Sequence, residues 1–266
     1  MILASAPLWT LPASALAVLA YVLPVLAPSR LGDRTMRWLL TLGWCAHGLT
    51  LLALLSGEVR FGFAPALSVT VWLVLTAYAV ERQFFPQLKV RWFIGMLGAA
   101  AVILALLFPG APLHVKASAW LPLHWALGLS AYGMFAAAVF HAWMMTRAER
   151  EIRQAHDGGS GLPLLTLERL TFRFVIAGFV LLTATLMAGA LFGEQLYGPD
   201  QSAWRWDHKR VFALLSWVTF AVLLLGRHFW GWRGRRAVRV LYIGAGLLLL
   251  SYAGSRFVME ILLGRA

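Results

Sequence analysis

The run Trp120-Leu-Pro-Leu-His124-Trp-Ala-Leu-Gly128-Leu-Ser130-Ala-Tyr132-Gly133 decides the class of fold. It opens a segment, residues 120–146, that contains no Asp, Glu, Lys or Arg. A helix that crosses the hydrocarbon core of a bilayer needs about 20 mostly apolar residues. The length and composition of this segment therefore predict a transmembrane helix.

Seven further segments are also mostly apolar and about as long as a membrane span. The breaks between them carry the Pro, Gly and charged residues that end helices. The segments lie at residues 8–27, 37–56, 63–80, 92–108, 169–192, 210–227 and 237–262. We therefore expect an all-α integral membrane protein, a single bundle of eight transmembrane helices that forms one domain over residues 1–266.

The composition supports a membrane protein. Hydrophobic residues make up 61% of the chain and charged residues 13%, against about 25% charged residues in a soluble domain. The first nine residues carry no basic residue, so no secretory signal is predicted. The longest polar segment, residues 147–168, contains Asp157-Gly-Gly-Ser-Gly161 and is expected to be a flexible linker.

The net charge of +12 is distributed as expected for membrane orientation. Of the 23 Lys and Arg residues, 16 lie in the loops after the first, third, fifth and seventh segments or within five residues of these loops, which leaves seven elsewhere. Positive loops face the cytoplasm, so both termini are predicted to be periplasmic in an inner-membrane protein. Short basic loops do not form a nucleic-acid groove, and no nucleic-acid partner is expected.

A polar loop, Trp204-Arg205-Trp206-Asp207-His208-Lys209, separates two of the apolar segments and is predicted to face outward. Tryptophan offers a flat apolar face with one N–H donor, and His208 adds a possible metal ligand. The loop suits a planar, amphipathic, metal-bearing ligand such as haem. The alternative is an interfacial anchor, because Trp collects at membrane boundaries.

Histidines are the candidate metal ligands, because Cys45 is the single cysteine. His114, His124 and His208 are predicted near the outer face. His47 lies near mid-membrane, where a ligand or relay role and a hydrogen-bonded core histidine are both open. His141 and His228 are expected to lie on the headgroup side, and His156 is expected to be a solvated linker residue.

Two spacings place polar residues on one helix face. His124, Gly128 and Tyr132 follow each other at four-residue intervals, which suits either a ligand site or small-residue helix packing. Arg256 and Glu260 are one turn apart and suit a side-chain pair. The alternative is that the planar guanidinium of Arg256 holds a carboxylate, such as a haem propionate.

Together these residues resemble the CcsA/CcmC family of cytochrome c assembly proteins, and more closely its YpjD/HemX-type branch. The resemblance covers most of the chain and is clearest from about residue 120 to 260. The landmarks that carry it, in chain order, are His124-Trp-Ala-Leu-Gly-Leu-Ser-Ala-Tyr132, Leu167-Glu168-Arg169, Trp206-Asp207-His208-Lys209, Gly231-Trp-Arg-Gly-Arg-Arg236 and Gly254-Ser255-Arg256.

In that family a periplasmic Trp-rich loop and flanking histidines hold haem for attachment to apocytochrome c. The resemblance implies that Trp204, Trp206 and Asp207 end this loop, and that His124 is the upstream ligand. The chain departs from the pattern in four places. Earlier loop tryptophans are absent, Asp207-His208-Lys209-Arg210 replaces Asp-Pro-Lys-Glu, Leu225 replaces a transmembrane histidine, and no histidine follows the last segment.

The resemblance implies a haem-handling protein, with no catalytic residues assigned and any bond-forming role dependent on partner proteins. The expected partners are haem, assembly proteins or apocytochrome c, and the lipid bilayer. Two alternatives are a non-enzymatic regulator or partner in tetrapyrrole metabolism and a small-solute transporter. The predicted haem-binding residues are His124, Trp204, Trp206, Asp207, His208 and Arg256, with His124 and His208 as the ligands of the iron.

Overall fold

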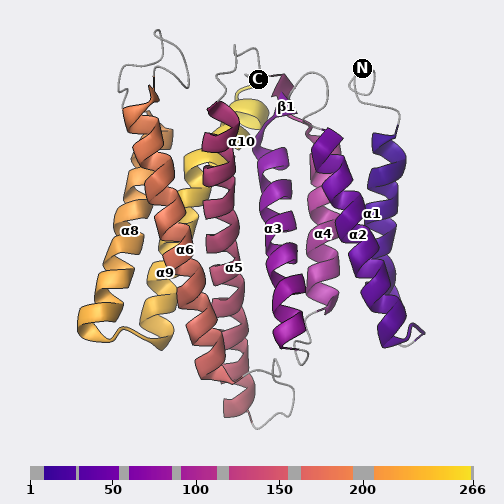
Figure 1. The fold of residues 1–266 in the computed structure, drawn as a ribbon, viewed down its shortest axis with the longest axis horizontal. Helices are drawn as coiled ribbons and strands as arrows, with labels where there is room; N and C mark the ends of the chain where they lie inside the picture. The colour runs from indigo at the N-terminus through magenta and orange to yellow at the C-terminus, as the bar shows by residue number, and fades with distance from the viewer. Residues whose placement is uncertain are drawn as a thin grey trace. The chain divides into compact units, whose positions relative to one another are not determined.

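The computed structural model describes residues 9–27, 30–53, 60–85, 91–112, 120–154, 163–193 and 207–264. In these residues the chain forms eight long helices and one pair of two-residue strands (Figure 1). The prediction of an all-α fold is confirmed, apart from this short pairing. The helices group into two compact units. Unit 1 is Met1–Phe84, Lys89–Leu113 and Arg256–Ala266, and unit 2 is Phe85–Leu88 and His114–Ser255.

Unit 1 is built around a buried tyrosine. Its elements are α1 (Thr10–Leu26), α2 (Asp33–Ala53), α3 (Phe63–Phe84), α4 (Arg91–Leu107) and the antiparallel strands β1 (Arg60–Phe61) and β2 (Ala111–Pro112). The ring of Tyr21 on α1 is buried between Gly43 of α2 and Gly98 of α4. A β-carbon on either glycine would approach this ring to within 3.0 Å, so glycine is required for this packing.

Unit 2 consists of α5 (Leu121–Arg153), α6 (Leu164–Leu191), α8 (His208–Trp230) and α9 (Gly234–Leu249). Helix α5 lies along α6, and α9 lies along α8 and also contacts α5. The core of unit 2 contains Phe135 of α5 stacked on Phe220 of α8, with ring centroids 3.7 Å apart. Gly178 and Gly244 allow this stack because their missing side chains leave room for the two rings.

The last helix changes its winding near its end. After α9 it continues as a π-helix η2 (Leu250–Gly254), a short turn α10 (Ser255–Phe257) and a second π-helix η3 (Val258–Leu262). Residues up to Ser255 belong to unit 2, and residues from Arg256 belong to unit 1. A π-helix bonds each N–H five residues back instead of four, which rotates the following side chains relative to an ideal α-helix.

Five of the described helices are long and apolar enough to cross a membrane. Two other apolar helices, Thr10–Leu26 and Phe93–Leu107, are shorter. The five candidates are Phe63–Phe84, Leu121–Arg153, Leu164–Leu191, His208–Trp230 and Gly234–Leu262. They match five of the eight predicted segments.

The predicted linker at residues 147–168 is wrong at both ends. Helix α5 runs on to Arg153, and α6 already begins at Leu164. Ala, Glu and Arg are strong helix formers, and Arg147 pairs with Glu151 one turn later at 2.7 Å. These residues extend the helix beyond its apolar part. The Gly-rich run 157–161 lies outside the described residues.

Candidate functional site

His124 lies in the first turn of α5 and is half-buried. Its imidazole faces α6, since a β-carbon placed on Gly189 would lie 3.6 Å from Cε1 of His124. Pro122 stands at the start of the helix, where a missing N–H costs no intrahelical bond. The helix start therefore holds the histidine at the end of the α5–α6 pair, with a glycine opposite its ring.

Among the described residues, the seam between α5 and α6 has fewer contacts at this end. A β-carbon on Gly189 would meet one described atom within 4 Å, and so would one on Gly128, which faces Thr185. Further along the same seam, a β-carbon on Gly178 would lie 3.1 Å from the Phe135 ring. The described part of the seam is thus tightly packed in its middle and less tightly packed beside His124.

The predicted face of α5 divides between two neighbours. Gly128 and His124 face α6, whereas the Tyr132 hydroxyl donates to the Leu248 carbonyl and lies 2.7 Å from Ser251 Oγ. Each four-residue step advances about 40° around a helix, because one turn takes about 3.6 residues. The Tyr132 side chain therefore points toward η2, and its hydroxyl donates to a backbone carbonyl just before this π-helix begins.

The start of α8 carries the end of the polar loop. Asp207 is the N-cap, and its Oδ1 accepts the N–H of Arg210 at 2.9 Å. His208 follows as the first helical residue and is exposed. The ammonium of Lys209 lies 6.0 Å from the centre of the Tyr252 ring in η2. Trp204 and Trp206, predicted as the flat ligand face, lie outside the described residues, as does His114.

Arg256 and Glu260 interact through their charges, but no ion-pair contact joins them among the described residues. Both side chains belong to unit 1, and Nε of Arg256 and Oε1 of Glu260 are buried without a hydrogen-bond partner. The i,i+4 neighbourhood depends on α-helical winding, and Val258–Leu262 is a π-helix. The carboxylate of Glu260 instead lies against Gly62. The role of Arg256 as a carboxylate holder stays a prediction.

Two further histidines, His47 and His141, are accounted for by packing. His47 is fully buried, with Nε2 2.8 Å from Ser68 Oγ and Nδ1 3.5 Å from the Tyr21 hydroxyl. This supports the core alternative. The prediction that His141 is a headgroup-side residue is wrong, because its ring is buried against Phe174. His141 lies on the α6-facing side of α5, where no solvent reaches it.

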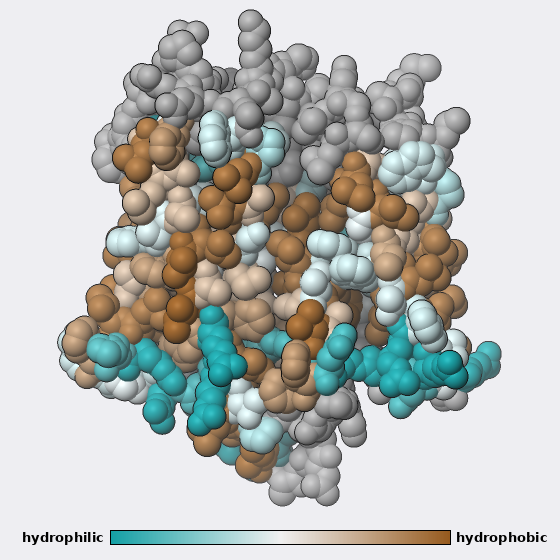
Figure 2. All heavy atoms as spheres, in the orientation of Figure 1, coloured by the Kyte–Doolittle hydropathy of each residue, from teal (hydrophilic) through white to brown (hydrophobic). Residues whose placement is uncertain are grey.

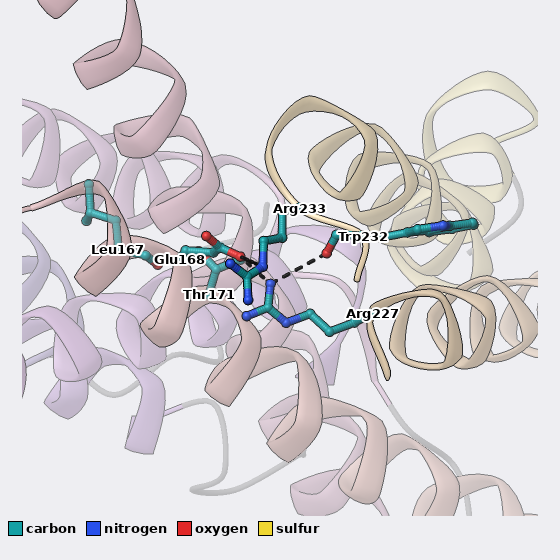
Figure 3. Close-up of polar contacts among 6 residues, drawn as sticks. All are labelled: Leu167, Glu168, Thr171, Arg227, Trp232 and Arg233. Atoms are coloured by element: carbon teal, nitrogen blue, oxygen red, sulfur yellow. Dashed lines mark hydrogen bonds and ion pairs between the residues drawn. The ribbon is translucent and has the colours of Figure 1, made fainter. Parts of the chain in front are cut away.

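One polar cluster was not predicted from the sequence. Glu168 of α6 forms an ion pair with Arg227 of α8, and Arg233 Nε lies 3.8 Å from the same carboxylate (Figure 3). The guanidinium of Arg227 also stacks on the Phe172 ring, 4.0 Å from its centre. The available signal was Glu168 itself, the one acidic residue of α6, because a carboxylate buried in a membrane protein requires a cationic partner.

Two described histidines, His124 and His208, are possible ligands for a haem group. No group of three or more His, Cys, Asp or Glu residues gathers to hold a bare metal ion in these residues. Haem needs only one or two protein ligands, and a histidine imidazole is a common one. His124 offers a half-buried imidazole beside Gly189, and His208 offers an exposed one. These two residues fit the group, whereas the predicted face for its flat ring, Trp204 and Trp206, lies outside the described residues.

Comparison with known proteins identifies the class. The sequence pattern of the cytochrome C assembly protein family matches residues 35–263. The match covers most of the chain and runs through His124, the start of α8 and the Glu168 cluster. The chain therefore belongs to the cytochrome C assembly protein family, and the predicted resemblance is confirmed. Its apolar helices make it a multi-pass membrane protein of that family.

Individual relatives fall into two named groups. The cytochrome c biogenesis protein CcsA of Synechococcus elongatus is 30% identical over 243 residues, which cover 80% of this chain and 73% of the relative. The CcsA protein of Prochlorococcus marinus is 27% identical over 226 residues, covering 79% and 68%. The inner membrane protein YpjD of Escherichia coli is 27% identical over 198 residues, covering 73% and 72%. No solved structure matches the chain.

Proposed function

We propose that this chain is a haem-handling protein of the inner membrane that acts in cytochrome c biogenesis. The observation that carries the proposal is the position of His124. Its half-buried imidazole lies opposite Gly189, at the less tightly packed end of the α5–α6 seam. Family membership supplies the class of ligand, since the CcsA relatives are cytochrome c biogenesis proteins.

Each predicted site residue has a distinct role in this proposal. His124 binds the iron through its imidazole, and His208 is the candidate for a second ligand because it starts α8 with its side chain exposed. Trp204 and Trp206 supply a flat apolar face for the ring. Asp207 caps α8 and thereby fixes the end of the loop that carries the two tryptophans.

The protein's part is binding and orientation. Haem supplies the iron and the ring that is handed on, and any bond-forming chemistry belongs to the haem and to cysteines of a partner. His124 and His208 hold the ring, and the tryptophans shield one side from water. We assign no catalytic residue to this chain.

The membrane arrangement that goes with this function is a single domain of eight transmembrane helices with both termini in the periplasm. The charge bias of 16 to seven among the 23 basic residues supports this orientation. The family match over residues 35–263 runs through both compact units, which supports their acting as one domain.

A second function, a non-enzymatic regulator or partner in tetrapyrrole metabolism, is favoured by Leu225. This residue stands where the haem-lyase members of the family have a transmembrane histidine, and 50% of its side chain is exposed. The site lacks that ligand, so the chain differs from a complete haem lyase. The transporter alternative loses support because His47 is fully buried and hydrogen-bonded rather than lining a pathway.

The test is an absorption spectrum of the protein, purified in detergent after haem-replete expression. We expect a haem band that weakens in His124→Ala and is partly restored by added imidazole. Changing both Trp204 and Trp206 to Leu keeps the loop apolar but removes its flat faces, and should also weaken the band. His156→Ala, in the polar linker, is the control and should leave the spectrum unchanged.

The outcomes separate the two functions. A wild-type protein that stays free of haem under these conditions overturns the ligand role of His124. The function as a regulator or partner in tetrapyrrole metabolism then remains. If the double tryptophan variant keeps the full band while folded, the loop is an interfacial anchor only. A changed band in His208→Ala would identify the second ligand.

A further inference from the structure

The turn between α8 and α9 carries a concentrated positive charge that the proposed function does not use. Four exposed arginines, which we name the arginine patch, lie within seven residues. They are Arg233, Arg235, Arg236 and Arg239. The first turn of α9 contains no acidic residue to neutralise them. Figure 2 shows hydrophilic side chains bordering the apolar helical surface at the end where α8 turns into α9.

The acidic group that contacts this turn already has an ion-pair partner. Glu168 is 12% exposed and forms its ion pair with Arg227, near the end of α8. Arg233 Nε is 3.8 Å from that carboxylate, and 67% of its side chain remains exposed (Figure 3). One carboxylate therefore faces two arginines, and the arginine patch keeps most of its positive charge.

The turn that presents the patch is fixed by its own contacts. Gly231 ends α8 in the left-handed region at φ 60°, and the N–H of Trp232 returns to the Gly226 carbonyl at 3.1 Å. The indole of Trp232 lies directly against Gly226, where a side chain would collide with it. The guanidinium of Arg236 lies 4.2 Å above the same indole. A preorganised turn loses little conformational freedom when it binds a ligand.

Apolar side chains adjoin the patch. Phe229 and Trp230, at the end of α8, are 67% and 71% exposed. Aromatic residues of this kind lie at the level of lipid headgroups. Along α8, the exposed Leu225 and Val222 continue the apolar surface away from the patch. The surface thus offers arginines to a phosphate and, next to them, aliphatic and aromatic side chains to acyl chains.

We propose that the arginine patch is a binding surface for an anionic phospholipid. The headgroup phosphate binds the guanidinium groups of Arg235, Arg236 and Arg239, and the acyl chains lie along Phe229 and Leu225. Arginine suits phosphate because its planar fork donates two parallel hydrogen bonds. Orientation in the membrane alone requires only the sign of the charge, whereas this turn adds a fixed geometry and an adjoining apolar surface.

The experiment measures thermal unfolding of the full chain in neutral detergent as lipid is added. Cardiolipin or phosphatidylglycerol should raise the midpoint, and phosphatidylcholine should not. The variant Arg235→Gln/Arg239→Gln should require about 30-fold more anionic lipid for the same shift, since each arginine near an anionic surface contributes about 1 kcal/mol to binding. Both side chains are exposed, so the variant should unfold at the wild-type temperature without lipid.

The matched control is Arg34→Gln/Arg37→Gln, which removes two exposed arginines from the start of α2, on the same predicted side. It should respond to anionic lipid like the wild type. The proposal is overturned if both double variants lose the response equally, or if neither does. An equal shift of the unfolding midpoint with phosphatidylcholine would show that apolar contact alone stabilises the protein. An equal shift with inorganic phosphate would reveal a site for free anions instead of a lipid surface.

Discussion

The imidazole of His124 and the backbone of Gly189 face each other across the α5–α6 seam, at the end where α5 begins. A β-carbon on Gly189 would lie 3.6 Å from Cε1 of His124, which is an ordinary van der Waals contact. A larger side chain would fill the space beside the ring. Gly189 therefore controls how much room remains next to the proposed haem ligand.

This relationship predicts a graded effect of side-chain size at Gly189. Gly189→Ala should leave haem retention unchanged, because its β-carbon fits. Gly189→Leu should weaken retention roughly tenfold, since overpacking typically costs about 1–3 kcal/mol. Haem titration of the purified variants, followed by absorption, measures the effect.

The control for Gly189 is Gly246→Leu. Gly246 on α9 is exposed, and a β-carbon there would meet no atom within 4 Å. This variant adds the same leucine without approaching His124 and should retain haem normally. Equal haem affinity in Gly189→Leu and wild type would remove the seam from the ligand site.

The ion pair of Glu168 with Arg227 predicts a stability effect. Removing either charge alone should destabilise the protein by about 1–3 kcal/mol, because the partner is left partly buried without its hydrogen bond. Glu168→Ala/Arg227→Ala should cost less than the sum of the single changes, since the residues are in contact. Denaturant unfolding in detergent gives the three free energies.

An ion pair within one helix of the same unit supplies the comparison. Arg147 and Glu151 pair at 2.7 Å on α5, with their side chains 46% and 16% exposed. Pairs four residues apart on a helix contribute about 0.3–0.5 kcal/mol. Glu151→Ala should therefore change stability far less than Glu168→Ala. Similar losses in the two variants would show that the Glu168 cluster contributes no more than surface charge.

The sequence predicted the helices well where their pattern is local. Residues 120–146 form a helix because the run is apolar and contains no charged residue. Asp207 was predicted at the end of the polar loop, and in the structure it caps α8. The end of α5 was missed because apolarity marks only the part of a helix that crosses lipid.

The parts that could not be predicted depend on distant residues. Glu168 and Arg227 are 59 positions apart in the sequence, and no local pattern connects them. Tyr132 bonds Ser251, 119 positions away, so the winding of η2 is coupled to another helix. The i,i+4 rule did not predict that Arg256 and Glu260 interact without an ion-pair contact, because the rule presumes α-helical winding.

The predicted orientation can be tested at two positions in segments outside the described residues. A cysteine introduced at Gly159 should be protected from a membrane-impermeant thiol reagent in intact spheroplasts, because basic loops stay in the cytoplasm. A cysteine introduced at Ser202 should react. Both variants carry Cys45→Ser, because Cys45 is exposed and would add its own signal. The reverse pattern of labelling would invert the protein and move the tryptophan loop to the cytoplasm.

The bond between Tyr132 and η2 gives the last prediction. The Tyr132 hydroxyl donates to the Leu248 carbonyl and contacts Ser251 Oγ, which itself lies 2.7 Å from that carbonyl. Tyr132→Phe removes this hydroxyl while keeping the ring, and should cost about 1 kcal/mol. Because the lost bond anchors η2, amide hydrogens of Leu250–Gly254 should exchange about fivefold faster. Tyr242→Phe, at a side chain that is 40% exposed on α9, is the control and should leave this exchange unchanged. If the amides of η2 exchange at the wild-type rate in Tyr132→Phe, the π-helical winding is maintained by the last helix alone, and α5 does not stabilise it.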